Sequence, residues 1–224
     1  MFSRKTIKFL KELSVNNNRD WFNENKQRYE DEVRTPALEF IESMAPALQK
    51  VSPYFDASAK KMGGSLMRVY RDTRFGHDKT PYKTNIGIHF RHVRAKDVHA
   101  PGFYVHIEPK ECFFGAGIWR PESSTLKAVR TLIDEHPKEW QSIKRKVTAK
   151  SDLELEGDSL KRAPKGFDPE HKLIDDLKRK DFIATCPLPI SSVYGKDFNK
   201  QVAKLLKTGA PLVEFICSAD DLMF

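Results

Sequence analysis

The chain has 224 residues, of which 39% are hydrophobic and 15 are phenylalanine, so it can build a sizeable core and is not typical of a disordered protein. Its 39 basic and 31 acidic residues give a net charge of +8, which favours anionic partners such as nucleic acid, anionic lipid or phosphorylated metabolites. No apolar run reaches about 18 residues, and basic side chains interrupt the first apolar stretch. We therefore expect neither a membrane-spanning helix nor a secretory signal.

The three cysteines of the chain, Cys112, Cys186 and Cys217, are isolated from one another in the sequence. No Cys-x-x-Cys pair is present, which excludes zinc-ribbon and thioredoxin-like motifs. An odd number of separated thiols is typical of a protein whose cysteines stay reduced, so we expect a cytoplasmic location.

The first quarter of the chain predicts helices. Apolar residues recur at helical spacing from Ile7 to Leu13, and the asparagines at 16–18 then end the pattern. A second helical pattern begins near Asp20, and Pro36 looks like the first residue of a new or kinked helix. The apolar stripes of these later helices contain Trp21, Phe22, Tyr29, Val33, Phe40, Met44, Leu48 and Val51. We expect this helical region to cover one face of a sheet.

Short segments rich in β-branched and aromatic residues follow, and they predict that sheet. They lie at 66–72, 84–93, 102–108 and 112–118. In the second of these segments Ile86, Ile88 and Phe90 face the same side, and the apolar residues of the third segment alternate in the same way. Pro109 and Lys110 mark a tight turn, so an antiparallel meander is the simplest connection.

The second half of the chain returns to helical spacing. Helices are expected from Ser123 or Ser124 to His136, and then over 140–147. We predict an irregular region over 148–170, a short helix over 173–177, a strand over 182–186, and a last helix that starts near Phe198 and is stopped by Gly209. The predicted fold is α+β: an antiparallel β-meander sheet of four to six strands, covered on one face by N-terminal and C-terminal helices. We expect a single domain over residues 1–224.

Four blocks of residues resemble the motifs of a known family. The first is Asn17-Asn18-Arg19-Asp20-Trp21-Phe22 with Asn25 and Tyr29. The second is Arg68-Val69-Tyr70-Arg71-Asp72-Thr73-Arg74-Phe75, followed by Asp78-Lys79-Thr80-Pro81-Tyr82-Lys83-Thr84-Asn85. The third contains Phe103, Tyr104, His106, Pro109, Gly115, Gly117, Trp119 and Pro121, and the fourth contains Lys161, Arg162, Pro164, Gly166, Phe167 and His171. With these blocks the chain resembles the domain-of-unknown-function family numbered twenty-four sixty-one, found in bacteria and fungi.

The resemblance extends over almost the whole chain and is most specific in the second block. Gly76 and His77 depart from it, because a serine and a basic residue are expected there. The resemblance implies a single domain. It carries no activity, cofactor or catalytic residue to this sequence.

The second block is also where the positive charge of the chain is concentrated. Between positions 68 and 96 eight basic residues face two acidic ones, a net of +6 out of the +8 of the whole chain. Arginine binds phosphate and carboxylate oxygens in two-point contacts, and an aromatic ring such as Phe75 or Tyr82 can stack on a base or a sugar. The candidate ligand-binding residues are Arg68, Arg71, Arg74, Lys79, Tyr82, Lys83 and Arg91.

A structural role for the same residues is the alternative interpretation. Arg71 and Asp72, or Asp78 and Lys79, can form local ion pairs, and an arginine buried here could pair with Glu108 or Asp72. Charge clusters of this kind mark both binding sites and structural networks.

A second group of polar residues is predicted to share one face of the sheet. By strand alternation His89 and Arg91 lie opposite Ile88, while His106 and Glu108 lie opposite the apolar residues of the next strand. His89, His106 and Glu108 are therefore candidates for an acid/base pair or for metal ligands. A His-x-Glu spacing also arises by chance on a partly exposed face, so we assign no metal and no cofactor.

Three functions follow from these patterns. The first is binding of a phosphorylated or other anionic small molecule by the Arg/Lys/aromatic segment. The second is an enzyme that acts on an anionic substrate with His106 and Glu108 as acid/base groups or metal ligands. The third is nucleic-acid binding, although no nucleic-acid motif is present.

Overall fold

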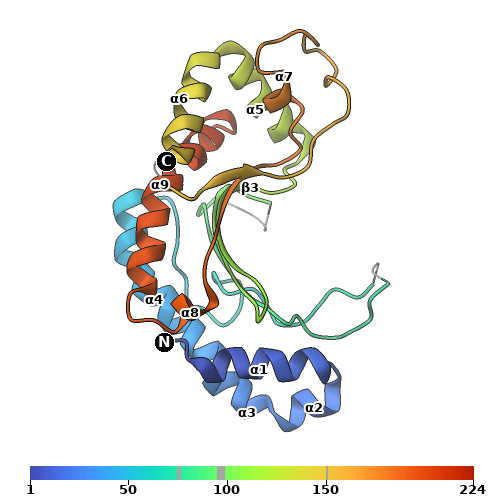
Figure 1. Cartoon of the computed structure of the whole chain (residues 1–224), viewed down its shortest axis with the longest axis vertical. Coiled ribbons are helices and arrows are strands. Elements are labelled where there is room, and N and C mark those ends of the chain that lie inside the picture. The colour runs from blue at the N-terminus through green and yellow to red at the C-terminus, as the bar shows by residue number, and fades with distance from the viewer. Residues whose placement is uncertain (75–76, 95–98, 150) are drawn as a thin grey trace.

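The N-terminal helices of the structure, a computed structural model, form one end of the molecule (Figure 1). The structure describes residues 1–74, 77–94, 99–149 and 151–224. The first helices are α1 (Arg4–Val15), α2 (Arg19–Glu24) and α3 (Lys26–Tyr29), and the π-helical turn η1 (Glu30–Arg34) joins them to α4 (Thr35–Val51). Ser3 and Thr6 form a capping box at the start of α1, and the side chain of Asn18 accepts a hydrogen bond from the Trp21 backbone N–H at 2.9 Å. The asparagines that end the first helix in the sequence therefore also start the second.

An antiparallel sheet occupies the middle of the molecule. Its strands in the described residues are β1 (Ile86–Arg91), β2 (Gly102–Ile107), β3 (Cys112–Ile118), β4 (Glu154–Glu156) and β5 (Phe182–Pro187), in the order β1-β2-β3-β5-β4. The first three strands form the predicted meander, and the α+β class is confirmed. The strand β4 was not predicted, because its three residues lie in the segment that we expected to be irregular.

The helices of the second half are α5 (Ser123–Glu135), α6 (Pro137–Thr148), α7 (Ile174–Leu177), α8 (Ile190–Val193) and α9 (Phe198–Ala219). Helix α9 packs against β2, β3 and β5, while α4 packs against β1 and against α9. One face of the sheet is thus covered by an N-terminal and a C-terminal helix, as predicted. No helix in the described ranges is both long enough and apolar enough to cross a membrane.

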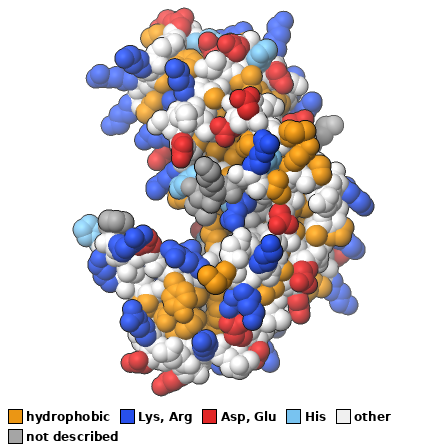
Figure 2. Space-filling model, turned by 180° about the vertical axis from the view of Figure 1, so that it is seen from behind, with side chains coloured by type: hydrophobic (Ala, Val, Ile, Leu, Met, Phe, Trp, Pro, Cys, Tyr) orange, Lys and Arg blue, Asp and Glu red, His pale blue; other side chains and the backbone are white. Residues whose placement is uncertain are grey.

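The two faces of the sheet differ sharply in composition. Side chains that point toward α4 and α9 are apolar and fully buried, among them Ile88, Phe90, Phe103, Val105 and Phe114. The opposite face carries His89, Tyr104, His106 and Phe113, which alternate with those residues along the strands. This second face borders the hollow between the two ends of the molecule (Figures 1 and 2).

The segment 66–72 is not a regular strand, which corrects the prediction. In the described residues this segment forms two isolated antiparallel bridges. Leu66 pairs with Ile88 in β1, and Tyr70 pairs with Tyr82, which precedes β1. Three residues (67–69) separate the bridges in this segment, whereas five residues (83–87) separate them in the partner segment. The unequal numbers prevent a continuous ladder of paired residues. The two extra residues belong to the stretch 83–87, which bends out of register.

The last helix does not stop at Gly209, which is a second correction. A Cβ atom at Gly209 would lie 2.5 Å from the Cβ atom of Ala116 in β3. The glycine is therefore needed where the helix approaches the sheet most closely, and α9 continues to Ala219. Close packing between helix and sheet, rather than a helix end, explains this residue.

Replacing Gly209 with alanine tests that contact. The higher helix propensity of alanine relative to glycine should stabilise α9 by about 0.8–1.0 kcal/mol. The steric overlap of the new Cβ atom with Ala116 should cost about 1–3 kcal/mol. We expect Gly209→Ala to lower the free energy of unfolding, measured by urea denaturation. The double variant with Ala116→Gly should recover part of the loss, and a single variant more stable than the parent protein would contradict the packing argument.

The buried cysteines predict a loss of stability at high pH. Burial raises the pKa of the Cys112 and Cys217 thiols to about 12 from an ordinary value near 9.0. As the pH rises from about 9 toward 12, the unfolded chain loses these protons first, so the free energy of unfolding falls. Cys217→Ala should make that fall shallower by about 1.4 kcal/mol per pH unit. Val213→Ala, a buried control in the same helix, should lower stability without changing the slope.

Candidate functional site

A cleft of about 330 Å³ lies between α2 and the bridge that joins Tyr70 to Tyr82. It is lined by Arg19, Asn23, Tyr70, Arg71, Pro81 and Tyr82. These residues come from two segments about fifty positions apart in the sequence, and both segments belong to the blocks described above. The fold thus brings an arginine of the first block opposite an arginine of the second.

Asn17 and Phe22 fasten the two walls of the cleft together. The Asn17 side chain donates to the Tyr82 carbonyl oxygen at 2.9 Å and accepts from the Tyr82 backbone N–H at 3.1 Å. The ring of Phe22 stacks on the ring of Tyr82 with centroids 3.9 Å apart. Tyr82 is only 3% exposed, whereas Tyr70, whose ring lies 5.4 Å from that of Tyr82, is 55% exposed. Tyr82 is therefore mainly a packing anchor, and Tyr70 offers the accessible aromatic surface.

The arginines of the segment make local ion pairs, in which Arg71 pairs with Asp78 rather than with Asp72, and Asp72 pairs with Arg74. The Arg71 Nη1 atom donates to the Asp78 carboxylate at 2.5 Å and to the Thr80 hydroxyl at 3.0 Å. Arg74 makes a two-point contact with Asp72, and these hydrogen bonds hold the pKa of the Asp72 carboxyl well below its usual range. These contacts brace the loop, in agreement with the structural interpretation of part of the segment.

Other basic residues of the segment differ in their surroundings. Lys79 donates to the Thr73 carbonyl oxygen at 2.7 Å, on the loop and outside the lining of the cleft. Burial, and then the positive charges of Arg68 and Arg71, lower the pKa of the Lys83 amine. Within the described ranges neither Arg68 nor Lys83 makes an ion pair with a carboxylate. Positive charge is therefore only partly compensated near the cleft.

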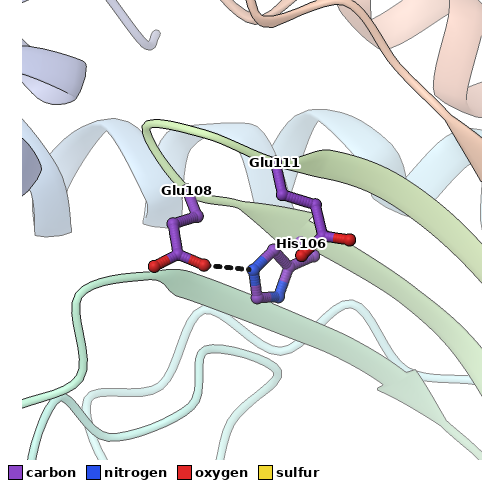
Figure 3. Close-up of side chains that lie close together, drawn as sticks. All are labelled: His106, Glu108 and Glu111. Carbon is purple, nitrogen blue, oxygen red and sulfur yellow. Dashed lines mark hydrogen bonds and ion pairs between the residues drawn. The ribbon is translucent and has the colours of Figure 1, made fainter.

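The open face of the sheet carries a second cluster, formed by His106, Glu108 and Glu111 (Figure 3). The His106 Nε2 atom lies 3.4 Å from Glu108 Oε2, and one ligand atom from each of the three residues lies within 4.8 Å of the others. The Glu108 backbone N–H donates to the Glu111 carbonyl at 2.7 Å, and the Glu111 N–H donates back at 3.3 Å. The tight turn after β2 therefore places the two glutamates directly opposite each other. Glu111 was not predicted, although the Pro109-Lys110 turn was the signal that could have revealed it.

Neighbouring side chains fix the orientation of the imidazole of His106. Its ring stacks on Phe113 with centroids 4.8 Å apart and an interplanar angle of 8°. Its Nδ1 atom lies 3.2 Å from the Tyr104 hydroxyl and 3.4 Å from the Asn85 side-chain nitrogen. Burial raises the pKa of Tyr104 to about 12, so this hydroxyl stays protonated at neutral pH.

Two other predicted candidates lie on the same face but away from this cluster. His89 is 7% exposed and pairs with Tyr104 in the register, whereas His106 pairs with Gly87. Arg91 lies at the far end of β1 and donates to the Gly63 carbonyl oxygen at 2.8 Å. Neither residue lines the cleft. Phe75, the other predicted stacking residue, lies outside the described residues.

Comparison with known families matches residues 5–215 to the family described as "Conserved hypothetical protein (DUF2461)". The chain belongs to this family. The match confirms the resemblance seen in the sequence, and both walls of the cleft and the His106 cluster lie within the matched range. Searches of curated proteins and of solved structures found no match to this DUF2461 chain.

The site of this DUF2461 chain also contains residues that the sequence did not single out. Arg19 and Asn23 come from α2, and Tyr70 belongs to the second block, where no binding role was assigned to it. Arg19 could have been found, because it lies within the first block of the family resemblance.

The double hydrogen bond of Asn17 predicts the effect of removing it. Asn17→Ala leaves the Tyr82 N–H and carbonyl without these partners, and it should lower the free energy of unfolding by about 1–3 kcal/mol. Hydrogen exchange at the Tyr82 amide should become faster. Asn16→Ala is the matched control, since its side chain bonds only locally to the Glu12 carbonyl. Unchanged protection of Tyr82 in Asn17→Ala would show that other contacts hold the cleft together.

Proposed function

We propose that this protein binds a small anionic ligand, such as a phosphorylated metabolite, in the cleft between Arg19 and Arg71. One observation supports the proposal above all: two exposed arginines from distant segments line one cleft together with an exposed tyrosine. A volume of about 330 Å³ is at the lower end of the range for small-molecule sites.

Arg71 is suited to this role by the way it is held. Asp78 and Thr80 both contact its Nη1 atom, and its side chain remains 37% exposed. A guanidinium group that is already oriented loses less conformational freedom when it binds an oxyanion in a two-point contact. Arg19 stands on the opposite wall, where it can contact the same anion.

The electrostatics of the surroundings favour the same ligand class. Burial, and after it the positive charges of Arg68 and Arg71, lower the pKa of Lys83, because these cations repel one another. A bound anion would relieve that repulsion, so its binding should be stronger than two arginines alone would give. Tyr70 adds a ring on which a sugar or a base can stack.

Thermal denaturation with added inorganic phosphate, a sugar phosphate or a nucleoside monophosphate tests the proposal. At a ligand concentration 100-fold above Kd the stabilisation should be about 2.7 kcal/mol, which corresponds to a rise in Tm of roughly 5–10 °C. Arg19→Gln and Arg71→Gln should abolish the rise. Arg145→Gln, which removes the same charge from the exposed face of α6, should keep it.

Two results would contradict the proposal. One is the absence of any shift with every anion tested. The other is an equal loss of the shift in Arg145→Gln, which would point to net charge rather than to a site. Retention of a single-stranded oligonucleotide at physiological salt, without any response to small anions, would favour nucleic-acid binding instead.

A further inference from the structure

We propose that His106, Glu108 and Glu111 form a binding site for a divalent transition-metal ion such as Zn²⁺ or Mn²⁺, at the end of the β2–β3 hairpin. The proposal is independent of the anion-binding cleft. Figure 3 shows the ring of His106 between the carboxylates of Glu108 and Glu111, which come from the two sides of the hairpin, and one ligand atom of each residue lies within 4.8 Å of the others.

The backbone of the hairpin forces the two glutamates together. Their backbone groups exchange both hydrogen bonds, so Glu108 and Glu111 are direct cross-strand neighbours on one face. His106 lies on that face as well, because it precedes Glu108 by two residues in an extended chain. The convergence of the three groups is thus set by the backbone rather than by the choice of side-chain rotamers alone.

The charges of the cluster are not balanced by the residues around them. Like charges directly opposite each other destabilise an antiparallel pair. In the part of the chain that the structure describes, neither Glu108 nor Glu111 makes an ion pair with a lysine or an arginine. A divalent cation between the carboxylates would remove this repulsion.

The distances fit metal coordination. Two ligand atoms about 2.1 Å from a tetrahedral centre lie roughly 3.4 Å apart. The distance between His106 Nε2 and Glu108 Oε2 is 3.4 Å. Glu111 is exposed, so its carboxylate can rotate to complete the site without disturbing the core. Three protein ligands leave a position for water or another ligand.

Residues outside the cluster hold the ligands in place. The Tyr104 hydroxyl lies 3.2 Å from the Nδ1 atom of His106 and can accept a hydrogen bond from an Nδ1–H group, which leaves Nε2 for the metal. The Thr84 hydroxyl donates to Glu108 Oε1 at 3.0 Å, which leaves Oε2 for the metal. The imidazole ligand suits zinc and the two carboxylates also suit manganese, whereas calcium and magnesium take oxygen ligands alone.

Calorimetric titration of the chelator-treated protein with ZnCl₂ and, separately, with MnCl₂ tests the site. We expect one ion per chain in at least one of the two titrations. His106→Asn should abolish that binding, and Glu111→Gln should weaken it by about ten-fold or more. The matched controls His136→Asn and Glu42→Gln alter exposed residues elsewhere and should bind as the parent protein does.

The result of the metal titration does not depend on whether the cleft binds an anion. Glu111 is exposed, so Glu111→Gln should stay folded, and circular dichroism verifies this. Binding by Glu111→Gln equal to that of the parent protein would overturn the proposal, as would the absence of binding of both ions. Binding of CaCl₂ with the same affinity would also overturn it, because a site that uses the imidazole should discriminate against calcium.

Discussion

The packing of α9 on β3 is the contact on which the rest of the structure depends. At Gly209 and Ala116 the helix approaches the sheet so closely that no further side-chain atom fits between them. Together with α4, this helix buries one face of the sheet, and no helix of the described residues covers the other. Polar residues such as His106 can occupy that second face because strand alternation separates them from the buried core.

The out-of-register stretch 83–87 connects the two candidate sites. Lys83 follows Tyr82, which lines the cleft, and burial and then nearby positive charges lower the pKa of its amine. The next two residues, Thr84 and Asn85, contact Glu108 and His106 on the sheet. The same irregularity that prevents a regular strand therefore places polar side chains against the second site, as irregular strand pairing often does near functional residues.

The sequence allowed much of the fold to be predicted, but less of the site. Helical spacing and strand alternation are local properties, so the α+β class, the meander and the polar face that holds His106 could be derived. The role of Gly209 could not, because it depends on an atom of β3 that is distant in the sequence. The importance of Arg19 was missed for the same reason, since only the fold brings it to the wall opposite Arg71.

By itself the sequence determined where the positive charge is concentrated, which residues of each strand share a face, and the membership of the family. The tertiary structure decided which of the charged residues meet. Arg74 forms an ion pair with Asp72, and Arg91 lies at the far end of β1. Arg19 and Arg71 both line the cleft. The physical reason is that charge and hydrophobic periodicity are properties of neighbouring residues in the sequence. A binding site, in contrast, is formed by contacts between distant segments, and the sequence alone does not show which segments meet.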